Sequence, residues 1–235
     1  MSIVTDHIGM GFIKTLSAIP RLRPLRLAIA GIHFNVDATS LVHDHIWDCT
    51  SLVLHKALRR YLKDGDHVLD LGTGHIGLLA IYCASIRRVT VLAVDVNLQF
   101  IENAQIVATA SLASGVEFRQ SDWFSNVDGH FDVIFGNVPY IPTEVGFHEL
   151  SSHTYPEIWD GGSDGLNPAR DILDCAPEYL SDQGLLMLGL DTAFVSDLSM
   201  TRLIEKSRDL ELQEIIKSWI SSSEVFVIRP RCHVH

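Results

Sequence analysis

The chain has 235 residues, which fits one large domain or at most two small ones and allows a substantial core. Hydrophobic residues make up 47% and charged residues 20%, with 18 Lys and Arg against 29 Asp and Glu, for a net charge of −11. This acidic surplus argues against a protein that coats nucleic acid, because phosphate contacts need an excess of Lys and Arg. The surplus lies in residues 67–235, which carry 10 basic and 23 acidic side chains, so a neutral or cationic ligand is favoured.

Four cysteines are widely spaced and form no Cys-x-x-Cys pair, namely Cys49, Cys83, Cys175 and Cys232. This spacing argues against a disulfide scaffold or a structural zinc site, so we expect free thiols and no bound metal. The N-terminus lacks the order of basic, apolar and small residues that marks a signal peptide. The longest uncharged runs, such as residues 27–32 and 185–190, are too short to span a bilayer. We therefore expect a cytoplasmic protein without membrane contact.

Hydrophobic periodicity predicts alternating helices and strands from residue 50 onward. Helices are predicted at residues 50–62, 76–85, 98–111, 168–180 and 195–207, and strands at residues 67–71, 89–95, 116–120, 131–136, 184–190, 212–219 and 224–228. Pro168 suits the first turn of the fourth helix, with Asn167 as its N-cap. The alternation is typical of an α/β fold, in which helices cover both faces of a mostly parallel sheet. The last two strands have no helix between them and should pair as a hairpin, which makes one edge strand antiparallel.

A glycine-rich loop separates the first strand from the helix that follows it. Residues 72–77 read Gly-Thr-Gly-His-Ile-Gly, and Asp95 ends the next strand. This pattern is typical of a dinucleotide site, in which glycines admit a ligand to the backbone and the acid accepts hydrogen bonds from ribose hydroxyls. Asp70 lies at the mouth of the loop, where its carboxylate would repel a pyrophosphate and attract a cation. S-adenosylmethionine has adenosine and a cationic head without phosphates, so it fits better, and an NAD-linked oxidoreductase is the rival interpretation.

Four further runs follow one another in a regular order along the chain. They are Val-Leu-Asp-Leu-Gly-Thr-Gly at 68–74, Ala-Val-Asp at 93–95, Gln-Ser-Asp-Trp-Phe-Ser at 120–125 and Asn-Val-Pro-Tyr-Ile at 137–141. Together they resemble the motifs of the class I S-adenosylmethionine-dependent methyltransferases. They are most similar to the HemK-type branch, which methylates a glutamine amide in peptide-release factors. The run at 155–166 resembles that branch's post-catalytic loop, and the resemblance, which covers about residues 36–229, implies a Rossmann-like sheet of seven strands.

The resemblance also implies roles in cofactor binding, carried over position by position. Three residues would cradle the methionine moiety of S-adenosylmethionine: Asp70, Gly72 and Gly74. Asp95 would hold the ribose, and Asp122 matches the acid that contacts the adenine amino group. Trp123 is either a surface on which the adenine stacks or an ordinary core residue.

Asn137, Val138, Pro139 and Tyr140 follow the fourth strand at the carboxyl edge of the sheet, where open α/β folds bind ligands. Methyl transfer to nitrogen is an in-line displacement that needs the nitrogen lone pair aimed at the methyl group, and no strong base. The side-chain carbonyl of Asn137 and the main-chain carbonyl of residue 138 would accept the two N–H groups of a planar amide or amine, and Tyr140 would keep that plane in place. The branch has Asn-Pro-Pro-Tyr, so Val138 leaves the loop less fixed and the acceptor open.

These patterns predict an N-methyltransferase that uses S-adenosylmethionine, releases S-adenosylhomocysteine and acts on an amine or amide of a small molecule or short peptide. Residues 1–45 are expected to be a helical or extended cover over the substrate, with residues 140–167, and residues 46–235 to be the catalytic domain. The short N-terminal segment and the run Trp-Asp-Cys-Thr at 47–50, which lacks the branch's arginine, weigh against a release-factor substrate. A release-factor glutamine methyltransferase is therefore the alternative, and a non-catalytic cofactor-binding module is a third interpretation. The oligomeric state does not follow from the sequence.

Overall fold

The computed structural model describes residues 49–149 and 156–231. In this part of the chain the strands are β1 (His67–Leu71), β2 (Thr90–Asp95), β3 (Val116–Gln120), β4 (Phe131–Asn137), β5 (Leu180–Asp191), β6 (Leu210–Lys217) and β7 (Ser223–Pro230). The α-helices are α3 (Cys49–Tyr61), α4 (Leu78–Ile86), α5 (Leu98–Ala110), α6 (Thr143–Glu149), α7 (Asn167–Cys175) and α8 (Asp197–Lys206). The expected cover at residues 1–45 lies outside the described residues. None of the helices listed here is long and apolar enough to cross a membrane.

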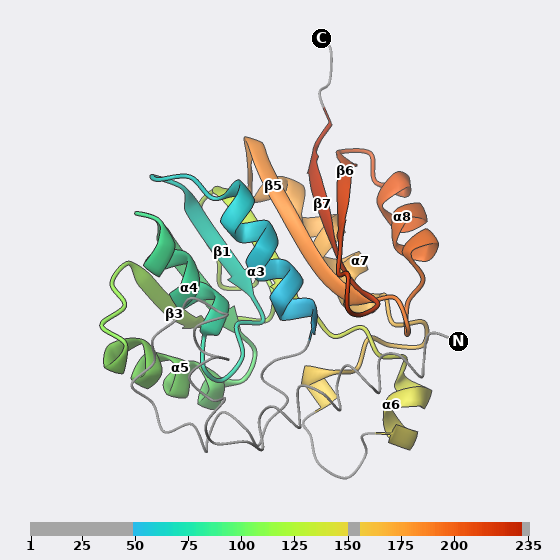
Figure 1. The fold of residues 1–235 in the computed structure, drawn as a ribbon, viewed down its shortest axis with the longest axis horizontal. Coiled ribbons are helices and arrows are strands. Elements are labelled where there is room, and N and C mark those ends of the chain that lie inside the picture. Colours follow the sequence, from blue (N-terminus) through green and yellow to red (C-terminus); the bar gives the residue numbers. More distant parts are fainter. Residues whose placement is uncertain (1–48, 150–155, 232–235) are drawn as a thin grey trace.

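The strands form one sheet in the order β3-β2-β1-β4-β5-β7-β6 (Figure 1). Strands β1 to β5 pair in parallel, whereas β7 is antiparallel to both β5 and β6. The predicted sheet and its closing hairpin are confirmed, and the strand that runs against the others is β7, second from the edge. The outermost strand, β6, carries a register shift between Leu212 and Glu214. The order of strands reverses between β1 and β4, so the carboxyl ends of these strands border the crevice where such sheets bind ligands.

Alternate side chains of each strand enter two hydrophobic cores on opposite faces of the sheet. On one face, Val68 of β1 and Val133 of β4 join a core with residues of α3, α4 and α5. On the other face, Leu69 and Ile134 join a core with residues of α7 and α8. Figure 1 shows α3 lying across the sheet in front and α7 behind it. The predicted cover of helices on both faces is therefore confirmed.

Two segments differ from the sequence-based prediction. The helix predicted at 168–180 ends at Cys175, and β5 already begins at Leu180. Pro177 contributes to the early end, because proline has no N–H to donate, and the chain continues as a 3-10 turn over Ala176–Glu178. This helix begins at Asn167, so its N-cap is Leu166 and not Asn167. The segment 140–167, predicted to be irregular, contains α6.

Candidate functional site

Three polar residues end neighbouring strands on one face of the sheet. Asp70 of β1 lies between Ala93 of β2 and Phe135 of β4. Asp95 and Asn137 follow those two partners by two positions each, which places them on the same face because side chains alternate along a strand. This is the face covered by α3 and α4. The structure thus brings together the residues predicted to bind the cofactor and the acceptor at the carboxyl ends of β2, β1 and β4.

Asp70 is a buried carboxylate, with only 2% of its surface exposed. Thr73 Oγ1 donates a hydrogen bond to Asp70 Oδ2 at 2.7 Å. Burial raises the pKa of Asp70 to about 7, and the negative charge of Asp95 adds to this rise. The hydrogen bonds from Thr73 and from the backbone N–H of Ala80 oppose it. Among the described residues no cationic side chain contributes to this balance. A buried carboxylate in this state is suited to pair with a cation that the ligand brings.

Asp95 ties the glycine loop to the end of β2. Its Oδ2 accepts a hydrogen bond from the N–H of Gly74 at 2.9 Å, and its Oδ1 accepts one from the N–H of Asn97 at 3.0 Å. Burial raises the pKa of Asp95, and the N–H groups of Asn97 and Gly74 oppose that rise. An ionised carboxylate has about four acceptor directions. Asp95 therefore keeps acceptor capacity for the hydroxyl groups of a ribose.

Two glycines of the loop at 72–77 have different structural roles. Gly77 has φ +59°, and a Cβ there would lie 2.5 Å from the ring of Phe118, so only glycine lets α4 begin this close to β3. Gly74 has φ +68°, and a Cβ there would meet nothing within 4 Å. Its partly buried backbone borders open space, into which a ligand can approach the main chain.

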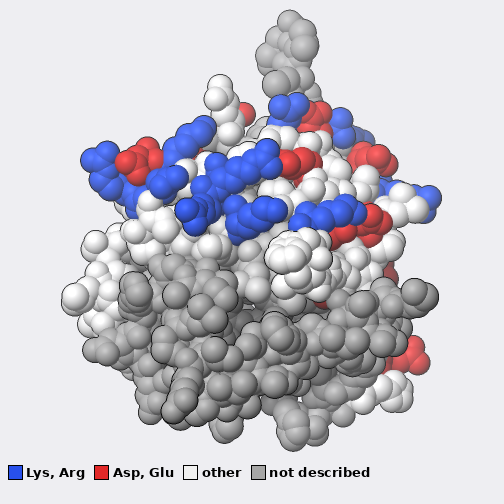
Figure 2. Space-filling model, in the orientation of Figure 1, with Lys and Arg blue, Asp and Glu red and all other residues white. Residues whose placement is uncertain are grey.

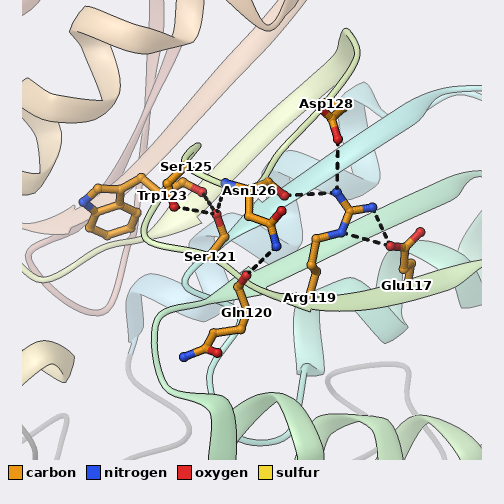
Figure 3. A network of polar contacts seen from close by, with 8 residues as sticks. All are labelled: Glu117, Arg119, Gln120, Ser121, Trp123, Ser125, Asn126 and Asp128. Atoms are coloured by element: carbon orange, nitrogen blue, oxygen red, sulfur yellow. Dashed lines mark hydrogen bonds and ion pairs between the residues drawn. The ribbon is translucent and has the colours of Figure 1, made fainter.

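The loop after β3 carries the two residues predicted to contact adenine, and Ser121 organises it (Figure 3). Ser121 Oγ donates to the carbonyl of Trp123 at 2.8 Å and accepts from the N–H of Asn126 at 2.9 Å. The N–H of Ser121 donates to the carbonyl of Asp95 at 2.9 Å. Arg119 braces the loop from outside by donating to the carbonyl of Asn126 at 3.0 Å. These bonds fix the loop relative to the end of β2.

Trp123 has a backbone conformation that side-chain-bearing residues rarely adopt, with φ +45°. Its ring packs against the core shared with α7 and α8, and a Cβ on Gly72 would lie 3.9 Å from it. The ring thus packs on the core and borders the glycine loop, and adenine stacking on it stays a prediction. Asp122 is exposed beside it, and its N–H donates to Ser125 Oγ at 3.1 Å.

The first residues of α3 support the predicted methyl-transfer corner. Asn137 Nδ2 donates a hydrogen bond to Ser51 Oγ at 3.1 Å, which turns Oδ1 of the amide away from Ser51. The hydroxyl of Tyr140 lies 3.3 Å from Thr50 Oγ1. Thr50 is fully buried and Ser51 is 7% exposed. Neither is a sequence-predicted site residue, although the threonine at the end of the run at 47–50 was a usable signal.

The rest of the corner is fixed by packing. Val138 is 4% exposed and enters the core on the opposite face, so this departure from the branch's proline fills the core. Pro139 and Tyr140 are partly buried. Gly165 has φ +77°, and a Cβ there would lie 2.4 Å from the carbonyl oxygen of Tyr140. The end of the run at 155–166, which reads Gly-Ser-Asp-Gly-Leu at 162–166, therefore packs directly against the corner. Asp164 of that run pairs with Arg170, and the hydrogen bond lowers the pKa of Asp164.

The chemistry of this site favours a ligand that joins a ribose to a cation. Asp70 and Asp95 are both buried, and the charge of one raises the pKa of the other. A pyrophosphate would add negative charge beside them, whereas an ammonium or sulfonium group would offset theirs. The open space at Gly74 and the ring of Trp123 complete a border for adenosine. S-adenosylmethionine therefore fits these residues and NAD fits them less well. In the described part of the chain, no group of three or more His, Cys, Asp or Glu side chains could hold a metal ion.

Comparison with known proteins identifies the family. The model of the methyltransferase small domain matches residues 33–150. The chain belongs to this family. Within it, the chain is 39% identical over 148 residues to a release factor glutamine methyltransferase from Pseudomonas aeruginosa, covering 59% of this chain and 51% of the relative. It is 28% identical over 171 residues to the enzyme of the same name from Agrobacterium fabrum, covering 71% and 58%. The resemblance to the HemK-type branch is thus confirmed, and the chain spans about half the length of these relatives.

A solved structure supports the fold of this methyltransferase family member. A methyltransferase from Pyrococcus furiosus superposes with a TM-score of 0.64 at 20% identity, covering 89% of this chain and 96% of that one. At this identity the match shows the fold alone. It confirms the class I sheet predicted from the sequence.

We expect Asp95→Ala to weaken the binding of S-adenosylhomocysteine by roughly 1.5–3 kcal/mol, because charge-assisted hydrogen bonds to the ribose would be lost. Isothermal titration calorimetry measures the effect. Asp95→Asn is the matched control, since it keeps one acceptor oxygen for the loop and should fall between the wild type and the alanine variant. An unchanged dissociation constant in Asp95→Ala would show that the ribose is held elsewhere.

Proposed function

We propose that this protein transfers a methyl group from S-adenosylmethionine to the side-chain amide nitrogen of a glutamine in a protein. The observation that carries the proposal is the amide of Asn137, held by Ser51 at the carboxyl end of β4. It lies on the same face as the two buried carboxylates suited to the cofactor, Asp70 and Asp95. The names of the relatives support a glutamine acceptor in a protein over the small molecule or short peptide first expected.

S-adenosylmethionine supplies an electrophilic methyl group when it is bound. The residues of this chain hold the acceptor. Asn137 Oδ1 accepts an N–H of the acceptor amide, and the carbonyl of Val138 accepts the other, so the nitrogen is fixed in one orientation. Tyr140 is anchored through its hydroxyl to Thr50, and its ring keeps the acceptor amide in one plane. One of the two N–H protons leaves the nitrogen for solvent when the methyl group is gained, and orientation of this kind lowers the barrier by several kcal/mol without a strong base.

A neutral amide side chain at position 137 suits a neutral acceptor. An aspartate there would favour a cationic or ring-nitrogen acceptor, because its carboxylate would attract positive charge. Two carbonyl oxygens together match the two N–H groups of a primary amide such as that of glutamine.

The proposal is tested by incubating the purified protein with S-adenosylmethionine and a bacterial peptide-release factor, followed by peptide mass spectrometry. We expect a mass increase of one methyl group on a single glutamine, and no increase when that glutamine is replaced by asparagine. Calorimetry should show binding of S-adenosylhomocysteine and none of NAD. Methylation of a small amine with no reaction on any protein would favour the first expectation from the sequence, and binding of NAD alone would overturn the assignment.

A further inference from the structure

A shallow basic groove runs beside α3 on the face of the molecule shown in Figure 2. It is lined by Lys56, Arg59 and Arg60 of α3 and by residues 214–217 of β6. Figure 2 shows Lys and Arg side chains gathered in a band across this face, with carboxylates interspersed along it. Such a band is unexpected in a chain whose net charge is −11.

Some cations of the band are neutralised within the protein and others are not. Arg60 pairs with Glu214 at 3.0 Å, and Lys217 pairs with Glu224 at 2.7 Å. Lys56 and Arg59 are exposed, and no carboxylate of the described residues forms an ion pair with either. The net negative charge of the chain already discourages association between copies, so that role does not account for these two cations. The two cations are therefore available to an anionic partner.

The helix presents its charges as one stripe. Lys56, Arg59 and Arg60 follow the spacing of i, i+3 and i+4, which places them on one side of the helix axis over a length of about 6 Å. Leu54 and Leu58, on the opposite side of α3, are buried in the core. The stripe is thus held in place by a packed helix, and a partner meets charges that are already positioned.

The groove lies close to the methyl-transfer corner. Asn137 pairs with Gly189 of β5, Gly189 pairs with Val225 of β7, and Val225 pairs with Ile216 of β6. Three strand spacings separate Asn137 from Ile216, which is about 14 Å. A glutamine side chain alone does not span this distance, but the surface of a folded protein does.

We propose that the groove docks an acidic segment of the protein whose glutamine is methylated. The inference rests on the proposed function, because it assumes a protein acceptor at Asn137. Acidic side chains match the two available cations, Lys56 and Arg59, which line the groove. A nucleic acid fits less well, because Glu214 and the acidic surplus of the chain oppose a continuous row of phosphates.

The test compares two double variants that change the net charge equally. Lys56→Glu with Arg59→Glu reverses the groove, and Arg202→Glu with Arg208→Glu reverses two exposed cations on and after α8. With a bacterial peptide-release factor as acceptor, the groove variant should lose at least tenfold in kcat/KM, mainly through KM, and the control should stay within twofold. The wild-type rate should fall with added salt, and the groove variant should lose this dependence.

A short glutamine peptide of the same release factor, without acidic residues, separates docking from catalysis. Both double variants should methylate it at the wild-type rate, and both should bind S-adenosylhomocysteine with wild-type affinity. An unchanged kcat/KM of the groove variant on the release factor would overturn the docking proposal while leaving the proposed function in place. Failure of the wild type on both acceptors would overturn the proposed function and the docking proposal with it. Loss of binding to a labelled RNA in the groove variant, with unchanged kinetics on the release factor, would assign the groove to nucleic acid instead.

Discussion

Asp70→Asn should make the ligand-free protein more stable above pH 7 while abolishing tight cofactor binding. Burial raises the pKa of the Asp70 carboxyl to about 7 in the folded protein, against an ordinary value of 3.8. The folded state therefore holds this proton through a pH range in which the unfolded state has released it, so stability falls as pH rises from about 4 to about 7. Three pKa units correspond to roughly 4 kcal/mol at most. Asparagine removes the charge and keeps an oxygen to accept the hydrogen bond from Thr73.

Chemical denaturation at pH 5 and pH 8 measures the first part of this prediction. The wild type should lose more free energy of unfolding between these two values than Asp70→Asn does. Calorimetry measures the second part with S-adenosylhomocysteine, which carries an ammonium group, and with methylthioadenosine, which carries none. The variant should lose affinity for the former and keep it for the latter. Lower stability of the variant at pH 8 would mean that the ionised carboxylate is compensated by a partner outside the described residues.

Asn137→Ala should depress single-turnover methyl transfer by about 100-fold or more, equivalent to roughly 2.7 kcal/mol of barrier. The alanine variant can no longer accept an N–H of the acceptor amide, so the nitrogen is no longer held in one orientation. The affinity for S-adenosylhomocysteine should hardly change, because the proposed role of Asn137 is to hold the acceptor. Folding should survive, because the side chain is only partly buried at the end of β4.

Ser51→Ala is the companion variant for Asn137. It removes the hydroxyl that accepts from Asn137 Nδ2 and leaves the amide itself in place. Its loss of rate should be smaller than that of Asn137→Ala, and the two losses should not add in the double variant, since both act on one interaction. Full turnover in a folded Asn137→Ala variant would remove the amide clamp. Loss of cofactor binding together with turnover would show that the residue has a structural role.

The sequence predicted the parts of the site that depend on regular patterns. Alternation along β1 and β4 is enough to place Asp70 and Asn137 on one face, and parallel pairing brings their strands together. The roles of Thr50 and Ser51 depend on where the first turn of α3 packs, which is a tertiary contact; the run at 47–50 pointed to Thr50, but no local signal marked Ser51. The glycine at 165 was recognised as part of a motif, but the reason for it, the carbonyl of Tyr140 directly beside it, appears only in the structure.

The order of the last strands and the ends of the helices were harder to predict, because they also depend on contacts distant in the sequence or on single residues. The hairpin of β6 and β7 follows from the lack of a helix between them, but which of the two pairs with β5 depends on long-range contacts, and the structure places β7 there. The early end of α7 was readable from Pro177, which the helical periodicity of the neighbouring residues concealed. Periodicity thus identified the elements, and single residues decided where they end.

Both outer strands of the sheet carry features that discourage pairing with another protein molecule. A strand at an edge offers a row of backbone N–H and carbonyl groups that a second sheet can use. The register shift between Leu212 and Glu214 interrupts this row on β6, because a bulge bends the strand out of a flat template. On β3, which has five residues, Arg119 and Glu117 pair at 2.6 Å and add charge to the edge. The two edges together should let the protein be concentrated without the edge-to-edge growth that leads to fibrils.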